Sequence, residues 1–424
     1  MQDRPLLIAA LDRLRKAGAV AAEVLLSTTD WLEQTGSRSA STSGSSVLWT
    51  VHAWRRGGAT GVGKGKTETE AVAHAMAASE HAPPDPNAGP AERQDVRAAG
   101  LSTFDRRYAT IESADRVEVL DSTERCFERS RENVRLRSIV YRQERVQRSW
   151  ASTRGVEATE QNTRFDLVGS VEAGASVAFS QRLASRHFSD VASLPFGTDL
   201  RRRAEPLART LPGPCPGLPV LIEPRAFADL LCALAPAFAA DHPGFLNVAL
   251  AANPKGVQLA PALLHVTDDG GLHSGLHTVA FDDRGVTSVP LTLLREGRVA
   301  SRYHSPETAR AHRSRPTGHV RGAALCPSNL VVRPGARTRN MIHAELGDLL
   351  LLDAPPALDL ARGRLHGFAR VVHVSGGEQL GSFEVPFNVE VSTFFAALSE
   401  FAADQERHFG VDTPTAVLSR LPTE

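Results

Sequence analysis

The chain has 424 residues, and its 48 lysines and arginines are balanced by 48 aspartates and glutamates. This zero net charge argues against a protein that binds nucleic acid through a strongly basic surface. Hydrophobic residues make up 42% of the chain, and no apolar run is long enough for a membrane helix. The composition therefore predicts a soluble protein of about two or three domains.

The N-terminus lacks the apolar core of a signal peptide, because Asp12 and Arg13 interrupt the apolar residues near it. The four cysteines are widely spaced and form no Cys-x-x-Cys pair. This spacing indicates neither a disulfide framework nor a cysteine zinc site. We therefore expect a cytoplasmic protein with reduced thiols.

The N-terminal half alternates predicted helices and strands. Thr67 is a helix-capping residue followed by glutamates and apolar residues, which is typical of a helix start. The proline-rich segment 82–95 cannot continue that helix and is interpreted as an exposed, linker-like excursion. The elements predicted in chain order are a helix at 5–16, strands at 21–27 and 47–54, a helix from Thr67, a charged helix at 114–132, and strands at 134–150 and 166–173.

The C-terminal half reads differently, since short apolar runs alternate with Gly, Pro and Asp turns from about residue 255. Helices are predicted near 225–240 and near 393–407, where Phe394, Phe395, Leu398 and Phe401 recur at helical spacing. The prediction is a predominantly β half with two helices.

A run of three arginines at 201–203 and a proline-rich stretch at 212–219 indicate a domain boundary near residue 205. We therefore predict an α+β fold with two domains. Residues 1–204 would form a sheet with long helices, and residues 205–424 a β-rich domain.

Two local motifs suggest ligand binding but fail in detail. Gly58 to Lys64 matches the first seven positions of a phosphate-binding loop, yet Gly65 stands where that loop needs Ser or Thr for magnesium. His273 and His277 are four residues apart, but glycines precede them and no acidic base lies between them. We interpret the first motif as a glycine-rich hairpin and the second as a turn.

Charged clusters are assigned to the surface or to turns. The arginines between 125 and 148 are interleaved with glutamates, which is typical of a solvated face. Asp268-Asp269-Gly270 and Asp282-Asp283-Arg284-Gly285 have the residue types of tight turns. Neither cluster predicts a nucleic-acid partner or a metal site.

Several short segments, taken in order, resemble the TldD/PmbA family of modulator-of-gyrase, zinc-peptidase-related proteins. The resemblance extends over most of the chain. Three of the segments are Ala280 to Val286, Arg315-Pro316-Thr317-Gly318 and Pro327-Ser328-Asn329-Leu330.

This resemblance implies a two-domain fold and a dimer of related subunits around a cleft that admits unfolded peptides. In the TldD kind of subunit, a helical H-E-x-x-x-H supplies zinc-binding histidines and a glutamate base. The PmbA kind, also called TldE, lacks that motif. Here the corresponding positions fall at Leu231, Cys232 and Pro236, and no H-E-x-x-x-H occurs in the chain.

The leading hypothesis is therefore a zinc-free, TldE-like subunit that pairs with a TldD-like zinc peptidase, or with itself. No cofactor is expected in this chain and zinc is expected in the partner. Ser328, Asn329 and Asn388 are candidates to bond a peptide backbone.

Two other hypotheses stay open. One is a free-standing, pathway-specific enzyme that reuses the cleft for a small molecule or modified peptide, with His273 and Cys232 as its candidate residues. The other is a nucleotide or nucleic-acid binder that depends on Lys64. The sequence leaves the substrate and any cleavage site open.

Overall fold

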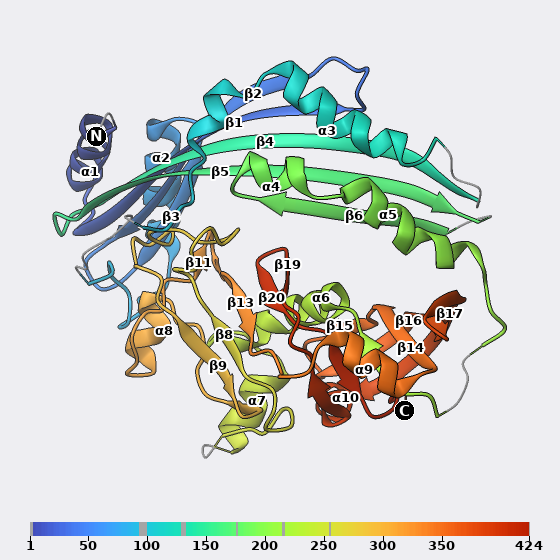
Figure 1. Ribbon diagram of the computed structural model, residues 1–424. Helices are drawn as coiled ribbons and strands as arrows, with labels where there is room; N and C mark the ends of the chain where they lie inside the picture. Colours follow the sequence, from blue (N-terminus) through green and yellow to red (C-terminus); the bar gives the residue numbers. More distant parts are fainter. Residues whose placement is uncertain are drawn as a thin grey trace.

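The computed structural model describes residues 3–92, 100–128, 133–174, 177–213, 217–253 and 256–423. Over these residues the chain has a mixed α+β fold with several sheets, and the N-terminal sheet lies over the C-terminal half (Figure 1). No helix in these ranges is both long and apolar enough to cross a membrane.

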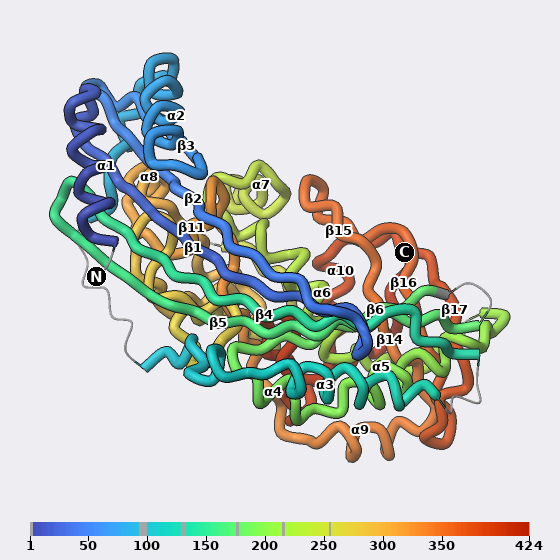
Figure 2. Tube along the Cα trace, turned by 90° about the horizontal axis from the view of Figure 1, so that it is seen from above, coloured from blue at the N-terminus to red at the C-terminus, as the bar shows by residue number. Residues whose placement is uncertain are grey.

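The N-terminal sheet has the strand order β3-β2-β1-β4-β5-β6, with antiparallel neighbours throughout. β4 has 19 residues and β5 has 17, and both run along the sheet (Figure 2). The four predicted strands are confirmed, and each is longer than predicted. The strands are β1 (Ala21–Thr35), β2 (Thr42–Trp54), β3 (Thr60–Gly65), β4 (Val134–Ser152), β5 (Glu157–Ala173) and β6 (Val177–Ser185).

Short helices cover one face of this sheet. Val24, Tyr141 and Phe165 lie on that face by their pairing register, and each is packed in a cluster with the helices. The helices and 3₁₀ turns are α1 (Arg4–Lys16), α2 (Glu68–His81), η1 (Arg106–Thr110), α3 (Ser113–Arg125), α4 (Phe188–Ser193), α5 (Phe196–Ala204) and η2 (Glu205–Ala208).

The expectation of long helices beside this sheet is wrong, because α2, with 14 residues, is the longest among the described residues. The predicted helix at 114–132 ends at Arg125, and β4 begins at Val134. Residues 129–132 lie outside the described residues. The alternating polar and apolar pattern that starts at Val134 favours a strand. The long elements of this half are therefore strands and not helices.

The glycine-rich hairpin predicted at Gly58 to Lys64 is confirmed. β2 pairs with β3, and Gly58 has a φ of +89°, which glycine adopts without strain. Gly63 allows α2 to lie directly on β3, since a Cβ there would stand 2.0 Å from the carbonyl oxygen of Ala71. The predicted cap is also present, because the Thr67 hydroxyl accepts the Glu70 N–H.

The excursion at 82–95 is described as far as residue 92, and residues 93–95 lie outside the described residues. Its described part is not simply exposed, since Ala91 is 6% exposed and the Gly89 carbonyl accepts hydrogen bonds from Arg284 and Arg310. The excursion therefore contacts the C-terminal half.

The C-terminal half is rich in short strands, as predicted, and they form three sheets. One has the order β10-β9-β8-β13-β20-β19, a second pairs β11 with β12, and a third has the order β15-β16-β14-β7-β21-β18 with β17 added beside β16. The strands are β7 (Val220–Ile222), β8 (Val266–Asp268), β9 (Leu291–Arg295), β10 (Arg298–Val299), β11 (Val320–Arg321), β12 (Ala324–Leu325), β13 (Leu330–Val332), β14 (Leu349–Ala354), β15 (Ala357–Asp359), β16 (Arg364–Ser375), β17 (Glu378–Glu390), β18 (Leu398–Phe401), β19 (Glu406–His408), β20 (Val411–Thr413) and β21 (Ala416–Leu418).

The two helices predicted in this half are shorter than expected. The first is α6 (Pro224–Leu234), which passes into the 3₁₀ turn η3 (Ala235–Phe238) because Pro236 lacks the N–H that an α-helix needs. The second is α10 (Val391–Ala396), so the predicted helix at 393–407 is wrong after its first turn. The remaining helices are α7 (Phe245–Ala252), α8 (Pro306–Ala311) and α9 (Arg339–Leu346).

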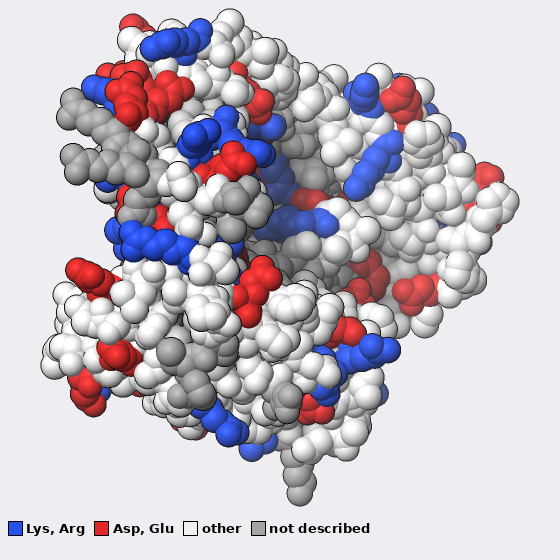
Figure 3. Space-filling model, turned by 90° about the vertical axis from the view of Figure 1, so that its right-hand side faces the viewer, with Lys and Arg blue, Asp and Glu red and all other residues white. Residues whose placement is uncertain are grey.

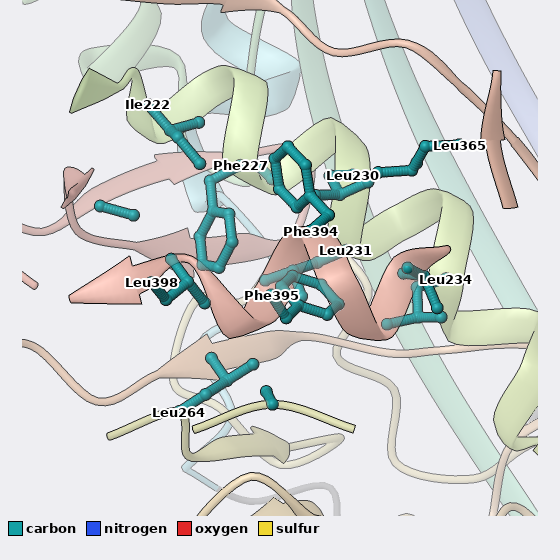
Figure 4. Close-up of a cluster of buried hydrophobic side chains, with 14 of the residues drawn as sticks. Ile222, Phe227, Leu230, Leu231, Leu234, Leu264, Leu365, Phe394, Phe395 and Leu398 are labelled. Carbon is teal, nitrogen blue, oxygen red and sulfur yellow. The ribbon is translucent and has the colours of Figure 1, made fainter. Parts of the chain in front are cut away.

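The core of this half forms around α6 and α10. Figure 4 shows Phe227 and Leu231 of α6 facing Phe395 of α10, and all three side chains are buried. A second cluster joins Phe179 of β6 to Leu221 of β7 and so crosses from one half of the chain to the other. The division near residue 205 remains a prediction.

Candidate functional site

A cavity of about 510 Å³ lies between the N-terminal sheet and the C-terminal half. Figure 3 looks into the hollow between these parts, where basic side chains gather. The cavity is lined by the open face of β4 and β5, by α6, and by three C-terminal loops. Its polar and sulfur-bearing lining residues are Glu144, Arg148, Asn162, Thr163, Arg164, Arg186, Cys232, His277, Asp283, Arg321, Cys326 and Ser328.

The wall made by the sheet follows from strand alternation. Glu144, Val146 and Arg148 are successive residues on one face of β4, and they pair across to Arg164, Asn162 and Glu160 of β5. Further along the same face, Trp150 packs against Phe281 of the C-terminal half. The sheet face is therefore apolar where it contacts the other half and polar where it lines the cavity.

Arg148 fixes the boundary between these two regions. Its side chain is 9% exposed, and it pairs with Glu160 at 2.7 Å and with Asp283 at 2.5 Å. It also donates to the Phe281 carbonyl at 2.9 Å. The interpretation of the whole arginine run as a solvated face is wrong at this residue, because its partner Asp283 is 135 residues away in the chain.

Asp268 is the anchor of the opposite wall. Its carboxylate accepts the Ser328 N–H at 2.8 Å, the Asn329 N–H at 3.0 Å and the Tyr303 hydroxyl at 2.8 Å. Burial alone would raise the pKa of Asp268, but His319 and these hydrogen bonds hold that pKa below its usual value. Asp268, predicted as a turn residue, is in fact fully buried and holds the 328–329 turn in place.

The three residues that are predicted to contact a peptide lie in different environments. Ser328 lines the cavity, is 2% exposed, and its Oγ has no hydrogen-bond partner among the described residues. The Asn329 side chain is used within the protein, because it bonds the His277 N–H, the Thr278 hydroxyl and the Asp269 carbonyl. Asn388 is an exposed residue of β17, is bonded by Arg364, and does not line the cavity.

The three positions that match the zinc motif do not form a metal site. Leu231 is 3% exposed and packs in the core, and Pro236 lies beyond the end of α6. Cys232 lines the cavity, but burial raises the pKa of its thiol to about 11, so the thiol is neutral near pH 7. These residues do not fit a zinc ion. Across the ranges that the structure describes, no three His, Cys, Asp or Glu residues are grouped to hold a metal.

The two histidines of the 273–277 turn lie in different environments. His277 lines the cavity, and burial together with the charges of Arg164 and Arg186 lowers its pKa to about 4. His273 is exposed and contacts Ser274. At neutral pH the cavity therefore presents a neutral imidazole and a neutral Cys232 thiol, so neither group adds a charge to its wall.

Arg186 is a cavity residue that the sequence did not reveal. It donates to the carbonyls of Gly275, Thr163 and Thr278 at 2.9 to 3.1 Å. An isolated arginine in an arginine-rich chain carries no local signal, and the carbonyls of Gly275 and Thr278 lie about 90 residues further along the chain. Only the folded chain brings them together.

Comparison with known proteins gives information on the family and the fold of this chain. Residues 216–422 match the family model described as the PmbA/TldA metallopeptidase C-terminal domain. No curated protein matches the chain.

Three solved structures are similar over nearly the full length. A putative modulator of DNA gyrase from Bacteroides thetaiotaomicron has 15% identity and a TM-score of 0.83, with 99% of this chain and 98% of that chain covered. A putative modulator of a DNA gyrase from Thermotoga maritima has 17% identity and a TM-score of 0.81, with 98% and 99% covered. TldE from Thermococcus kodakarensis has 16% identity and a TM-score of 0.83, with 98% of each chain covered. At these identities the likeness shows a shared fold.

Proposed function

We propose, since this chain belongs to the PmbA/TldD metallopeptidase family, that it is a TldE-like subunit without a hydrolytic centre of its own. In this proposal it pairs with a TldD-like zinc peptidase and helps to enclose an unfolded or modified peptide. The zinc ion and the water-activating glutamate belong to the partner. A homodimer is the alternative assembly.

The observation that carries the proposal is the chemistry of the motif positions. Leucine and proline have no atom that binds zinc, and a single cysteine supplies one ligand where a zinc site needs three or four and offers no carboxylate base. Leu231 also lies in the packed core of Figure 4, where an imidazole would replace apolar contacts. The cavity nevertheless keeps polar atoms without partners, which is typical of a surface that binds a ligand.

Coexpression with a TldD-like chain from the same genome tests this proposal. We expect the two chains to copurify and the pair to cleave a denatured, fluorescently labelled protein. The matched control carries Gln in place of the partner's motif glutamate and should assemble without cleaving. Zinc-dependent cleavage by the isolated 424-residue chain would contradict the proposal.

A free-standing enzyme is a second candidate, because Cys232 and Cys326 both line the cavity. Burial raises the pKa of both thiols, which reduces their nucleophilicity at neutral pH. Metal analysis of the purified chain separates the two candidates. Stoichiometric metal in the wild type that is lost in Cys232→Ala or His273→Ala would favour the enzyme. Absence of bound metal from the wild type and from both variants would favour the TldE-like subunit.

A further inference from the structure

The charges that line the cavity are mostly paired, with two exceptions. Arg148 is paired with Glu160 and Asp283, and Arg164 with Asp166. Among the carboxylates, Glu144 is paired with Arg142, a residue outside the cavity lining. Arg186 and Arg321 are the two lining arginines outside these direct ion pairs.

Neither of these two arginines forms an ion pair with a described residue. Arg186 donates only to neutral carbonyl groups. Arg321 donates through Nη1 to the Val320 carbonyl, and its Nη2 has no hydrogen-bond partner among the described residues. Burial lowers the pKa of Arg186 to about 10 and also lowers the pKa of Arg321. Nearby carboxylates oppose both shifts without forming an ion pair, namely Glu160 for Arg186, and Asp282, Asp283 and Glu160 for Arg321. Arg186 thus stays protonated near pH 7.

Two further polar atoms at the cavity lack partners. Asn162 is 4% exposed, and its Oδ1 accepts no hydrogen bond within the described part of the chain. The same holds for the hydroxyl of Ser328, which is 2% exposed. Unbonded buried polar groups are costly, and a ligand that bonds them recovers that cost. An amide oxygen accepts an N–H, and a serine hydroxyl donates to or accepts from a peptide group.

We propose that this cavity is a subsite for a peptide carboxylate. Arg186 and Arg321 supply the opposite charge, while Asn162 and Ser328 bond the peptide groups next to it. The volume of about 510 Å³ lies within the range of small-ligand pockets, which is enough for one or two residues. The carboxylate belongs either to an acidic side chain or to the C-terminus of the peptide. This inference rests on the proposed function only in assuming that the cleft admits peptides.

Binding of three N-dansyl tetrapeptides to the full-length chain tests the subsite. The first has Glu at its second position and an amidated C-terminus. The second has Gln at that position and a free C-terminus, and the third has Gln there and an amidated C-terminus. We expect at least one of the first two to bind about ten- to a hundredfold more tightly than the neutral third, because charge-assisted hydrogen bonds are the stronger ones. Preference for the first identifies a side-chain carboxylate, and preference for the second a terminal one.

Two variants test the residues. Arg321→Gln removes the positive charge of the guanidinium group whose Nη2 is unbonded. Asn162→Asp places a second anion next to the proposed position of the peptide carboxylate. Both should reduce the preference for the charged peptide about tenfold or more, with a thermal unfolding midpoint close to that of the wild type. Arg362→Gln is the matched control, because that side chain is 80% exposed and outside the cavity.

Equal binding of charged and neutral peptides, absence of binding at millimolar concentration, or equal effects of Arg321→Gln and Arg362→Gln would each overturn the subsite. None of these results bears on pairing with a TldD-like chain, which is scored by copurification and cleavage. The two proposals therefore fail separately.

Discussion

His277 is the residue in the cavity whose protonation most clearly depends on folding. Its pKa is lowered to about 4 by burial and by Arg164 and Arg186, against 6.5 in an unfolded chain. Between these values the unfolded chain binds a proton that the folded chain does not. Stability is therefore expected to fall as the pH drops below 6.5 and to go on falling to about pH 4.

This effect can be measured with a His277→Gln variant. Linkage for the two pKa values gives His277 a contribution of about 2 kcal/mol to the loss of stability of the wild type between pH 7 and pH 5. Urea unfolding at both values should show the smaller loss in the variant, by roughly that amount. A loss of the same size in both proteins would mean that His277 does not titrate as the structure indicates.

At the scale of single elements, the β3–α2 unit depends on glycine for close contact and not for backbone freedom. A Cβ at Gly63 would meet the Ala71 carbonyl oxygen at 2.0 Å, so Gly63→Ala must push α2 away from the sheet. We expect a loss of about 1–3 kcal/mol or more, as for overpacking of a core.

Gly271→Ala is the matched control, because its nearest contact would be an ordinary 3.5 Å and its φ is not positive. Denaturant unfolding of both variants checks the prediction. Equal stability of the two variants would show that α2 shifts without cost.

The same scale shows what the sequence can predict and where it fails. The Thr67 cap predicts α2 because its signal is local, with the hydroxyl and the amide that it bonds three residues apart. Phe394, Phe395, Leu398 and Phe401 suit one face of a helix, but Leu398 and Phe401 are buried by pairing of β18 with β21. Short apolar runs do not distinguish helix from strand, and here a distant partner decides.

Some features of the candidate site can also be predicted from the sequence and others cannot. The absence of zinc ligands at Leu231 and Pro236 can be read from the sequence alone, because it is a matter of residue type. The role of Arg186 and Arg321 cannot be predicted from the sequence, because it depends on whether a carboxylate lies close enough in space to form an ion pair with them. Asn329 shows the same dependence on the fold. It is predicted to bind a peptide, and in the structure its side chain forms hydrogen bonds with His277, Thr278 and Asp269.

At the scale of the whole molecule, the two halves are joined on both sides of the cavity. On one side, Arg284 pairs with Glu23 of β1 at 2.6 Å, and both side chains are almost fully buried. On the other, Phe179 of β6 lies under the guanidinium groups of Arg225 and Arg370, at 5.0 and 5.6 Å from the ring centre. The cleft is therefore closed at two ends by contacts of different kinds.

Phe179→Ala should weaken the second junction. Phe179 is 2% exposed, so its truncation is expected to lower the free energy of unfolding by about 3–5 kcal/mol. Phe368→Ala is the control, because that ring is 64% exposed and its loss should cost about 0.5 kcal/mol or less. Thermal unfolding compares the two variants, and similar midpoints would mean that Phe179 does not support the junction.

β4 and β5 run between these two junctions and form the roof of the cavity. A strand of 19 residues is roughly 60 Å long, and its neighbours on both sides bond it along most of that length. A roof supported at both ends cannot swing aside in the way that a lid hinged at one end can. Under the proposed function, a peptide would then enter as a narrow, extended chain, and the free and peptide-bound forms of the protein should superimpose closely. Such a cleft would select peptides by their cross-section before any side chain is recognised, as a consequence of the length of one pair of strands.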